Sequence, residues 1–300
     1  MHVSPALWAI TIGVLVALIA ADFFIGGRKP HEVSIKEAGT WTAVWVALAA
    51  LFGGFLWWHG GARPAGEFFA GYVTEKSLSV DNLFVFVLIM AKFAVPRIHQ
   101  QRVLMFGVII ALVLRALFIA GGAALIATFS WVFYFFGAFL VWTAWKLLKE
   151  ARKGHQDEQY QENKLLLLVR RRFPAVSTLT VVMIAIGTTD LLFALDSIPA
   201  IFGLTQDPYI VFTANAFALM GLRQLYFLIG GLLERLVHLS YGLSLILGFI
   251  GVKLVLHALH ESGVPVPQIG IPVSLGFIVL VLGVTTLTSL RASRRSVEAG

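Results

Sequence analysis

The chain is organised as long apolar runs separated by short polar segments. A helix needs about 20 apolar residues to cross a hydrocarbon core of about 30 Å, and nine runs approach that length. They fall near 5–25, 41–58, 67–90, 103–122, 128–148, 178–200, 208–230, 240–260 and 271–290. The run at 178–200 is the least regular, because Asp190, Asp196 and Pro199 interrupt it. The pattern predicts an all-α polytopic membrane protein with about nine transmembrane helices.

Composition supports the membrane class and narrows the chemistry. The sequence is 58% hydrophobic and only 13% charged, with a mean hydropathy of +0.85, whereas about a quarter of a soluble domain is charged. Cysteine is absent, which excludes disulfides, thiolate metal sites and dithiol chemistry within the chain. Any bound metal must therefore be held by oxygen or imidazole. The net charge of +7 does not indicate nucleic-acid binding, because the basic residues lie in short loops.

The distribution of Lys and Arg predicts the orientation. If the N-terminus faces outward and the C-terminus inward, eighteen basic residues lie in the cytoplasmic loops and tail, and only Arg63 lies outside. This asymmetry satisfies the positive-inside rule and agrees with an odd number of spans. The four remaining basic residues lie within spans: Lys76, Arg115, Arg223 and Lys253.

A pattern of acidic residues occurs twice. In each copy two acids are six residues apart, and a polar residue follows the second acid. The members are Glu75, Asp81 and Asn82 in the first copy, and Asp190, Asp196 and Ser197 in the second. Acidic residues are rare inside membranes, so this match is harder to attribute to chance than an alignment of apolar runs.

Two weaker matches follow in the same order. Arg115 and Arg223 each lie in a Leu-Arg-x-Leu-aromatic segment. Residues 137–150 also align without gaps with residues 248–261. Each copy has three spans, so the second must lie upside down, as in transporters whose site lies at the midplane between inverted repeats. The predicted divisions are two N-terminal helices (1–66), repeat 1 (67–150), a basic cytoplasmic linker (151–175), repeat 2 (176–262), and a C-terminal helix with a basic tail (263–300).

The intramembrane charges indicate function. One carboxylate at the bilayer centre costs about 2.5–3.5 kcal/mol on insertion scales, and four acids occur against two arginines, Arg115 and Arg223. Mutual neutralisation in buried salt bridges is the structural alternative, but it leaves two acids that need protons or a cation. Carboxylates, the Asn82 amide and the hydroxyls of Ser197 and Thr188 are hard oxygen donors, which suit Mg²⁺, Ca²⁺ or Mn²⁺.

Helical geometry constrains how these groups meet. Positions i and i+7 share a face, whereas i and i+6 do not, so Glu75 faces with Asn82 and Asp190 with Ser197. For both acids of a pair to reach one ion, the helix must unwind locally. Pro199 favours such a break in the second copy, since proline removes a helical hydrogen bond.

Other polar residues have simpler interpretations. Asp22 is expected at the membrane interface, Lys76 is expected to pair with a nearby acid or to extend toward the surface, and Asn215 indicates a hydrogen bond between helices. A secondary metal or proton site is conceivable where three polar side chains follow helical spacing. These are His257, His260 and Glu261.

Two long motifs, 74–89 (TEKSLSVDNLFVFVLI) and 188–228, together with the nine-span plan, resemble the TerC family of integral membrane proteins, in particular its Alx-type members. The resemblance extends over essentially the whole chain. It implies a bacterial inner-membrane protein linked to tellurium resistance, with manganese efflux or homeostasis as its activity and links to metal supply for exported proteins. It places the family's acidic motif positions on the six residues named above as the two acidic copies.

Three functions are compared. The leading hypothesis is export of a divalent cation, in particular Mn²⁺, by alternating access and proton exchange, with no enzymatic activity and no resident cofactor; its partners are the ion and the bilayer. The second is a non-transporting membrane protein that assists metal loading or a redox or tellurium stress response with membrane or secretory partners. The third, an aspartyl hydrolase using Asp81 and Asp196 as a dyad, fits less well because amide and hydroxyl neighbours favour coordination.

Overall fold

The computed structural model describes residues 3–22, 24, 33–129, 131–153, 177–229 and 238–298. The helices in these ranges are α1 (Pro5–Asp22), α2 (Ile35–Gly60), α3 (Ala62–Lys92), α4 (Arg97–Thr128), α5 (Val132–Lys153), α7 (Thr178–Phe202), α8 (Pro208–Leu219), α9 (Leu222–Ile229), α10 (Leu239–Glu261) and α11 (Ile271–Glu298). Most of the predicted linker at 151–175 lies outside the described residues, so its structure is not considered.

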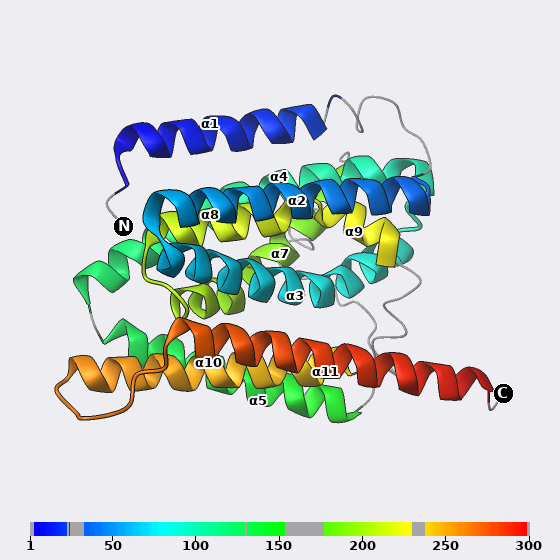
Figure 1. The fold of residues 1–300 in the computed structure, drawn as a ribbon. Coiled ribbons are helices and arrows are strands. Elements are labelled where there is room, and N and C mark those ends of the chain that lie inside the picture. Colours follow the sequence, from blue (N-terminus) through cyan, green and yellow to red (C-terminus); the bar gives the residue numbers. More distant parts are fainter. Residues whose placement is uncertain are drawn as a thin grey trace.

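The helices run roughly parallel to one another, and the two ends of the chain lie at opposite ends of the bundle (Figure 1). Eight helical segments of the described chain are long and apolar enough to span a membrane, and α8 and α9 together form one of them. Helix α3 is equally long but carries acidic and basic residues along its length. With α3 included, the described helices make nine crossings, which confirms the predicted polytopic α-helical class.

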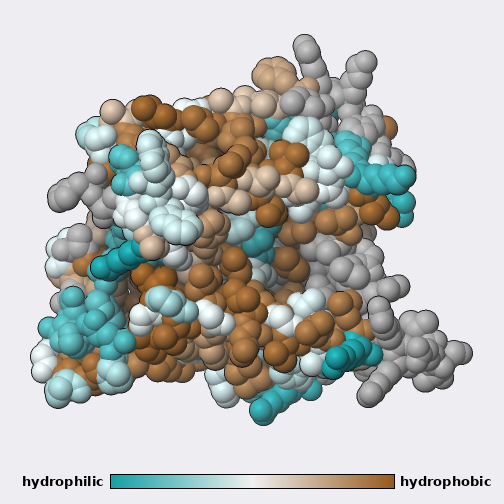
Figure 2. Space-filling view, viewed as in Figure 1, coloured by the Kyte–Doolittle hydropathy of each residue, from teal (hydrophilic) through white to brown (hydrophobic). Residues whose placement is uncertain are grey.

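The outer surface of the bundle is apolar, as a lipid-facing surface must be. Hydrophobic side chains cover much of the middle of the face in Figure 2, and hydrophilic ones gather mainly toward its two ends. Leu51, Leu117 and Leu280 are 65–70% exposed although each lies within a long helix. In water such exposure would be costly, but in a bilayer these side chains contact acyl chains, which are also apolar.

The packing of the helices follows the predicted inverted repeat. Helix α4 packs on α7, and α3 packs on α8. If α3 corresponds to α7 and α4 to α8, swapping the two repeats turns the α4–α7 contact into the α8–α3 contact. Helix α5 packs extensively on its counterpart α10, so swapping the two repeats leaves this contact unchanged. The pattern is what two inverted three-helix copies related by a pseudo-two-fold axis produce.

The contact between α5 and α10 corrects the gapless alignment of 137–150 with 248–261. A Cβ added at Gly137 would lie 2.9 Å from the carbonyl oxygen of Gly251 and 2.7 Å from Val255, and one at Gly251 would lie 2.9 Å from both the Gly137 oxygen and Val141. These contacts are symmetric if Gly137 corresponds to Gly251 and Val141 to Val255. The alignment paired Gly137 with Gly248 and was therefore three residues out of register.

The predicted helix break near Pro199 is also wrong. Helix α7 continues through Pro199 to Phe202, and the amide of Gly203 donates to the Pro199 carbonyl at 2.9 Å. Helix α3 is continuous as well. Instead, the span predicted at 208–230 is interrupted between α8 and α9, where Met220 is extended (ψ 132°) and Gly221 has φ +80°. Only glycine adopts that φ without strain.

Candidate functional site

A buried arginine joins the two repeats at the centre of the bundle. Arg115 lies near the middle of α4, and its side chain contacts Glu75 near the middle of α3 and Asp190 near the middle of α7. Arg115, Glu75 and Asp190 are each no more than 1% exposed. Because all three lie halfway along helices that cross the bundle, the cluster lies near the membrane midplane.

Arg115 binds the two carboxylates differently. Its Nε and Nη2 donate to the two oxygens of Asp190 at 2.8 and 3.1 Å, which is the paired geometry of the strongest arginine–carboxylate contacts. Only Nη1 contacts Glu75, through Oε1, and the same nitrogen donates to Ser197 Oγ at 3.1 Å. One guanidinium balances only one of the two carboxylates in this region of low dielectric constant, and Lys76, the residue after Glu75, is another cation that interacts electrostatically with that acid.

Beside Glu75, α3 presents further oxygen atoms. Ser79 and Asn82 follow Glu75 at i+4 and i+7 and therefore share its face, and both are buried. Glu75 Oε2, Ser79 Oγ and the neighbouring Thr74 Oγ1 have no hydrogen-bond partner among the residues that the structure describes. Buried oxygens without a donor are costly, so this face of α3 is a suitable place for a cation or for water.

The two acids of the second predicted pair do not converge on one point. Asp196 is half-buried and accepts a hydrogen bond of 3.1 Å from Thr143 of α5, whereas Asp190 and Ser197 face Arg115. The six-residue spacing separates the two acids around a continuous α7, as helical periodicity dictates. The side chain of Asp81 lies outside the part of α3 whose side chains the structure describes.

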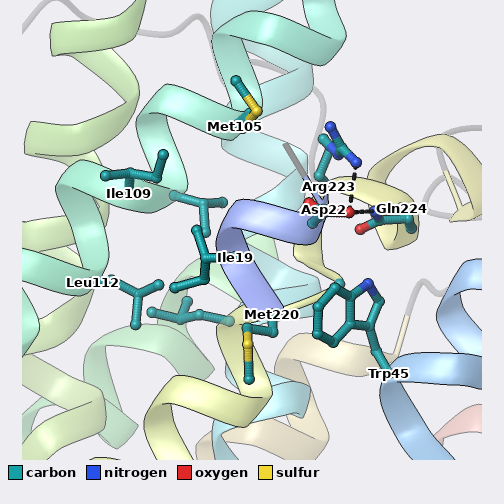
Figure 3. A pocket seen from close by; sticks show the side chains of 12 residues that line it. Ile19, Asp22, Trp45, Met105, Ile109, Leu112, Met220, Arg223 and Gln224 are labelled. Atoms are coloured by element: carbon teal, nitrogen blue, oxygen red, sulfur yellow. Dashed lines mark hydrogen bonds and ion pairs between the residues drawn. The ribbon is translucent and has the colours of Figure 1, made fainter. Parts of the chain in front are cut away.

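Arg223, predicted to balance the second acid pair, contacts a different acid. It donates to Asp22 at the end of α1 at 2.8 Å, and Gln224 donates to the same Asp22 oxygen at 2.9 Å (Figure 3). Asp22 is thus a partner of an arginine as well as an interfacial residue. A cavity of about 30 Å³, with room for about one water molecule, adjoins this cluster and is lined also by Trp45 and Met220.

Lys76 forms no ion pair within 4 Å with an acid whose side chain the structure describes, and its amino group points into the protein. Its Nζ donates to the carbonyls of Ala218 and Met220 at 2.9 and 3.3 Å. These carbonyls lie at the interruption between α8 and α9, where helical partners are lost. At the corresponding position of α7 is Leu191, and α4, the counterpart of α8, is continuous from Arg97 to Thr128. The two repeats therefore differ at this position.

The triad predicted from helical spacing does not form a metal site in the structure. His257 contacts Gln206 at 2.6 Å and lies 3.7 Å from Glu261. Across the described ranges, no three His, Asp or Glu side chains lie close enough together to hold a metal ion. The candidate oxygen ligands instead combine one carboxylate with hydroxyl and amide groups.

Sequence reasoning missed two features of the centre. Ser79 is not among the predicted ligands, although its i+4 spacing from Glu75 signals a shared face. Thr143, the partner of Asp196, carries no signal in the sequence, because a threonine in an apolar run ordinarily bonds to its own helix. Asn215 is fully buried in α8 with an amide nitrogen that has no partner among the described residues, so the predicted bond between helices is not observed for that atom.

Comparisons with known proteins agree with this architecture. The model of the integral membrane protein TerC family matches residues 60–297. The uncharacterized membrane protein Rv2723 of Mycobacterium tuberculosis is 46% identical over 91% of this chain and 74% of its own length. The uncharacterized membrane protein STKORF319 of Myxococcus xanthus is 40% identical over 98% and 94%. A protein of Escherichia coli K12 named "Putative membrane-bound redox modulator Alx" is 39% identical over 95% and 93%. No solved structure matches the chain.

Proposed function

Since the chain belongs to the TerC family of integral membrane proteins, we propose that it exports a divalent metal cation, Mn²⁺ in particular, across a bacterial inner membrane. The observation that carries the proposal is the buried centre in which Glu75 and Asp190, one from each of the two inverted repeats, share the single guanidinium of Arg115. Intramembrane ionisable groups in this position are characteristic of transport pathways.

The donor set favours a hard cation. Glu75, Ser79, Asn82 and Ser197 offer carboxylate, hydroxyl and amide oxygens, and the sequence has no cysteine. Such ligands suit Mn²⁺, Mg²⁺ or Ca²⁺. Glu75 also gives a route for coupling, because a proton can neutralise the same carboxylate when the metal leaves. Export would then be driven by proton entry.

The test is transport by the purified protein in liposomes. Wild-type protein should move Mn²⁺, and Glu75→Gln should abolish the flux by removing the charge of the only carboxylate with an unpaired oxygen in the described centre. Glu150→Gln is the matched control, since Glu150 lies at the end of α5 with its side chain 50% exposed. Absence of flux in the wild type, or unchanged flux in Glu75→Gln, would contradict the proposal.

The names of the Escherichia coli relatives favour the second candidate, a protein that influences redox state or metal loading without transport. Since the chain has no thiol, such an effect would have to be indirect, through a metal or a protein partner. This candidate predicts a stable complex with another membrane or secretory protein and no Mn²⁺ flux from the purified chain.

A further inference from the structure

We infer that Arg115 is a tethered cation, which neutralises Glu75 while the transport site is empty and releases it when a divalent ion binds. The inference rests on the proposed function and assigns a role to the arginine within the same site. It follows from three observations on the centre: the unequal binding of the two acids, the unpartnered oxygens on one side of Glu75, and the asymmetry between the two repeats.

The first observation is that Asp190 anchors Arg115 while Glu75 does not. Asp190 engages two guanidinium nitrogens with both of its oxygens, a geometry that fixes the plane of the group. Glu75 is held by Nη1 alone, and Nη1 has Ser197 Oγ as a second acceptor. The contact with Glu75 can therefore break while Arg115 remains bound to Asp190 and Ser197.

The second observation is that the other side of Glu75 already offers ligands. Glu75 Oε2 and Ser79 Oγ are buried and lack partners in the described part of the chain, and Asn82 lies on the same face of α3. A divalent ion bound there would compete with Arg115 for Glu75, because both are cations and the guanidinium carries its charge at any physiological pH.

The third observation is the asymmetry between the repeats. Arg223, the counterpart of Arg115, lies after the interruption at Gly221 and pairs with Asp22. Among the described residues, Arg115 is therefore the arginine that contacts both central acids. Without Arg115, an ion-free centre would bury two carboxylates without their guanidinium partner, which is strongly unfavourable in a region of low dielectric constant. Arg115 thus permits the ion-free protein to change conformation. Net transport requires this step, because the protein must return without an ion. Exchange of one ion for another does not require it, because the protein returns with an ion bound.

The experiment compares two fluxes of Mn²⁺ from loaded liposomes: net efflux into Mn²⁺-free medium, and exchange of internal radioactive Mn²⁺ for external Mn²⁺. The test variant is Arg115→Gln, which leaves Glu75 and Asp190 without their guanidinium. The matched control is the double variant Arg115→Gln/Asp190→Asn, which removes an opposite pair of charges and keeps the formal charge of the centre. In Arg115→Gln, exchange should continue near the wild-type rate, while net efflux falls about ten-fold or more, since each 1.4 kcal/mol on a barrier is a factor of ten. The control should lose less net efflux. Parallel loss of both fluxes, or unchanged net efflux, would overturn the inference.

A second measurement does not depend on transport. The Mn²⁺ concentration that raises the melting temperature of the purified protein reports binding at the centre. If Arg115 competes with the ion, the double variant should be stabilised at several-fold lower Mn²⁺ than the wild type. Equal or weaker binding in the variant would show that Arg115 only shapes the ligands, and would overturn the inference even if the wild type transports Mn²⁺. Absence of flux in the wild type together with tighter binding in the variant would contradict the proposed function alone.

Discussion

Arg115 and Asp190 form a buried ion pair in which two nitrogens meet two oxygens at 2.8 and 3.1 Å, linking α4 to α7. Asp190→Asn weakens the two-nitrogen, two-oxygen contact, while Arg115 keeps Glu75 and Ser197 as partners, so the expected cost is that of charge-assisted hydrogen bonds, about 1.5–3 kcal/mol. We expect a large fall in the melting temperature in detergent.

Asp196→Asn is the control for this prediction. Asp196 is half-buried and has a single hydrogen bond from Thr143, so its loss should cost about 1 kcal/mol or less. Equal melting temperatures for Asp190→Asn and Asp196→Asn would contradict the assigned pairing.

Lys76→Met tests the contact between α3 and the α8–α9 interruption. The variant removes the donor to the Ala218 and Met220 carbonyls, and a buried acceptor left without a partner costs about 1–3 kcal/mol. Thermal unfolding should show this loss. Lys146→Met removes an exposed lysine and should change stability by no more than about 0.5 kcal/mol; equal effects of the two changes would argue against the contact.

Alanine at Gly137 or Gly251 should weaken the contact between α5 and α10. Each added methyl meets a carbonyl oxygen at 2.9 Å, and backbone cannot move aside as a side chain can. Overpacking of this kind costs about 1–3 kcal/mol. Gly276→Ala in α11 meets nothing within 4 Å and should be neutral or stabilise by up to about 1 kcal/mol. A melting-temperature series in one detergent compares all three, and similar values would refute the close approach.

Gly221→Ala should destabilise the protein more than Gly263→Ala. Both glycines have positive φ, +80° and +85°, so both variants bear the strain of an L-residue at positive φ, about 1–2 kcal/mol. Only at Gly221 would the methyl also meet Trp45, at 2.8 Å, whereas nothing lies within 4 Å at Gly263. The difference between the two melting temperatures therefore isolates packing against Trp45, and no difference would mean that α2 does not pack there.

The predicted orientation is measured by cysteine labelling, for which the cysteine-free chain needs no prior changes. Gln268→Cys lies in the exposed connection between α10 and α11, and Arg97→Cys at the exposed start of α4. With the N-terminus outside, an impermeant maleimide should label intact cells at residue 268 and not at residue 97. Labelling in the opposite order would reverse the topology.

The sequence predicted the helices and the central acids well, because both depend on local properties. Hydropathy identifies spans through the cost of placing polar backbone and side chains in lipid. Glu75 and Asp190 were found because charges in apolar runs are rare, and their association with Asn82 and Ser197 on shared faces follows from the helical period.

The errors all concern relations between helices. Pro199 does not break α7, since membrane helices tolerate proline when neighbouring groups satisfy the freed carbonyl. The interruption lies at Gly221 because Lys76, distant in the chain, supplies donors there. The partner of Arg223 is Asp22, a residue outside both repeats. No periodicity within one segment encodes such contacts, and the three-residue error in the α5–α10 register has the same origin.

The glycine contact between α5 and α10 also bears on the origin of the bundle. Gly137 meets Gly251 as a patch meets its own copy in an isologous dimer, and Val141 and Val255 flank the contact symmetrically. A single three-helix chain that inserted into the membrane in both directions would form the same interface with a second molecule of itself. Gene duplication and fusion would then fix one copy in each direction and free Arg223 and Lys76 to diverge from Arg115 and Leu191.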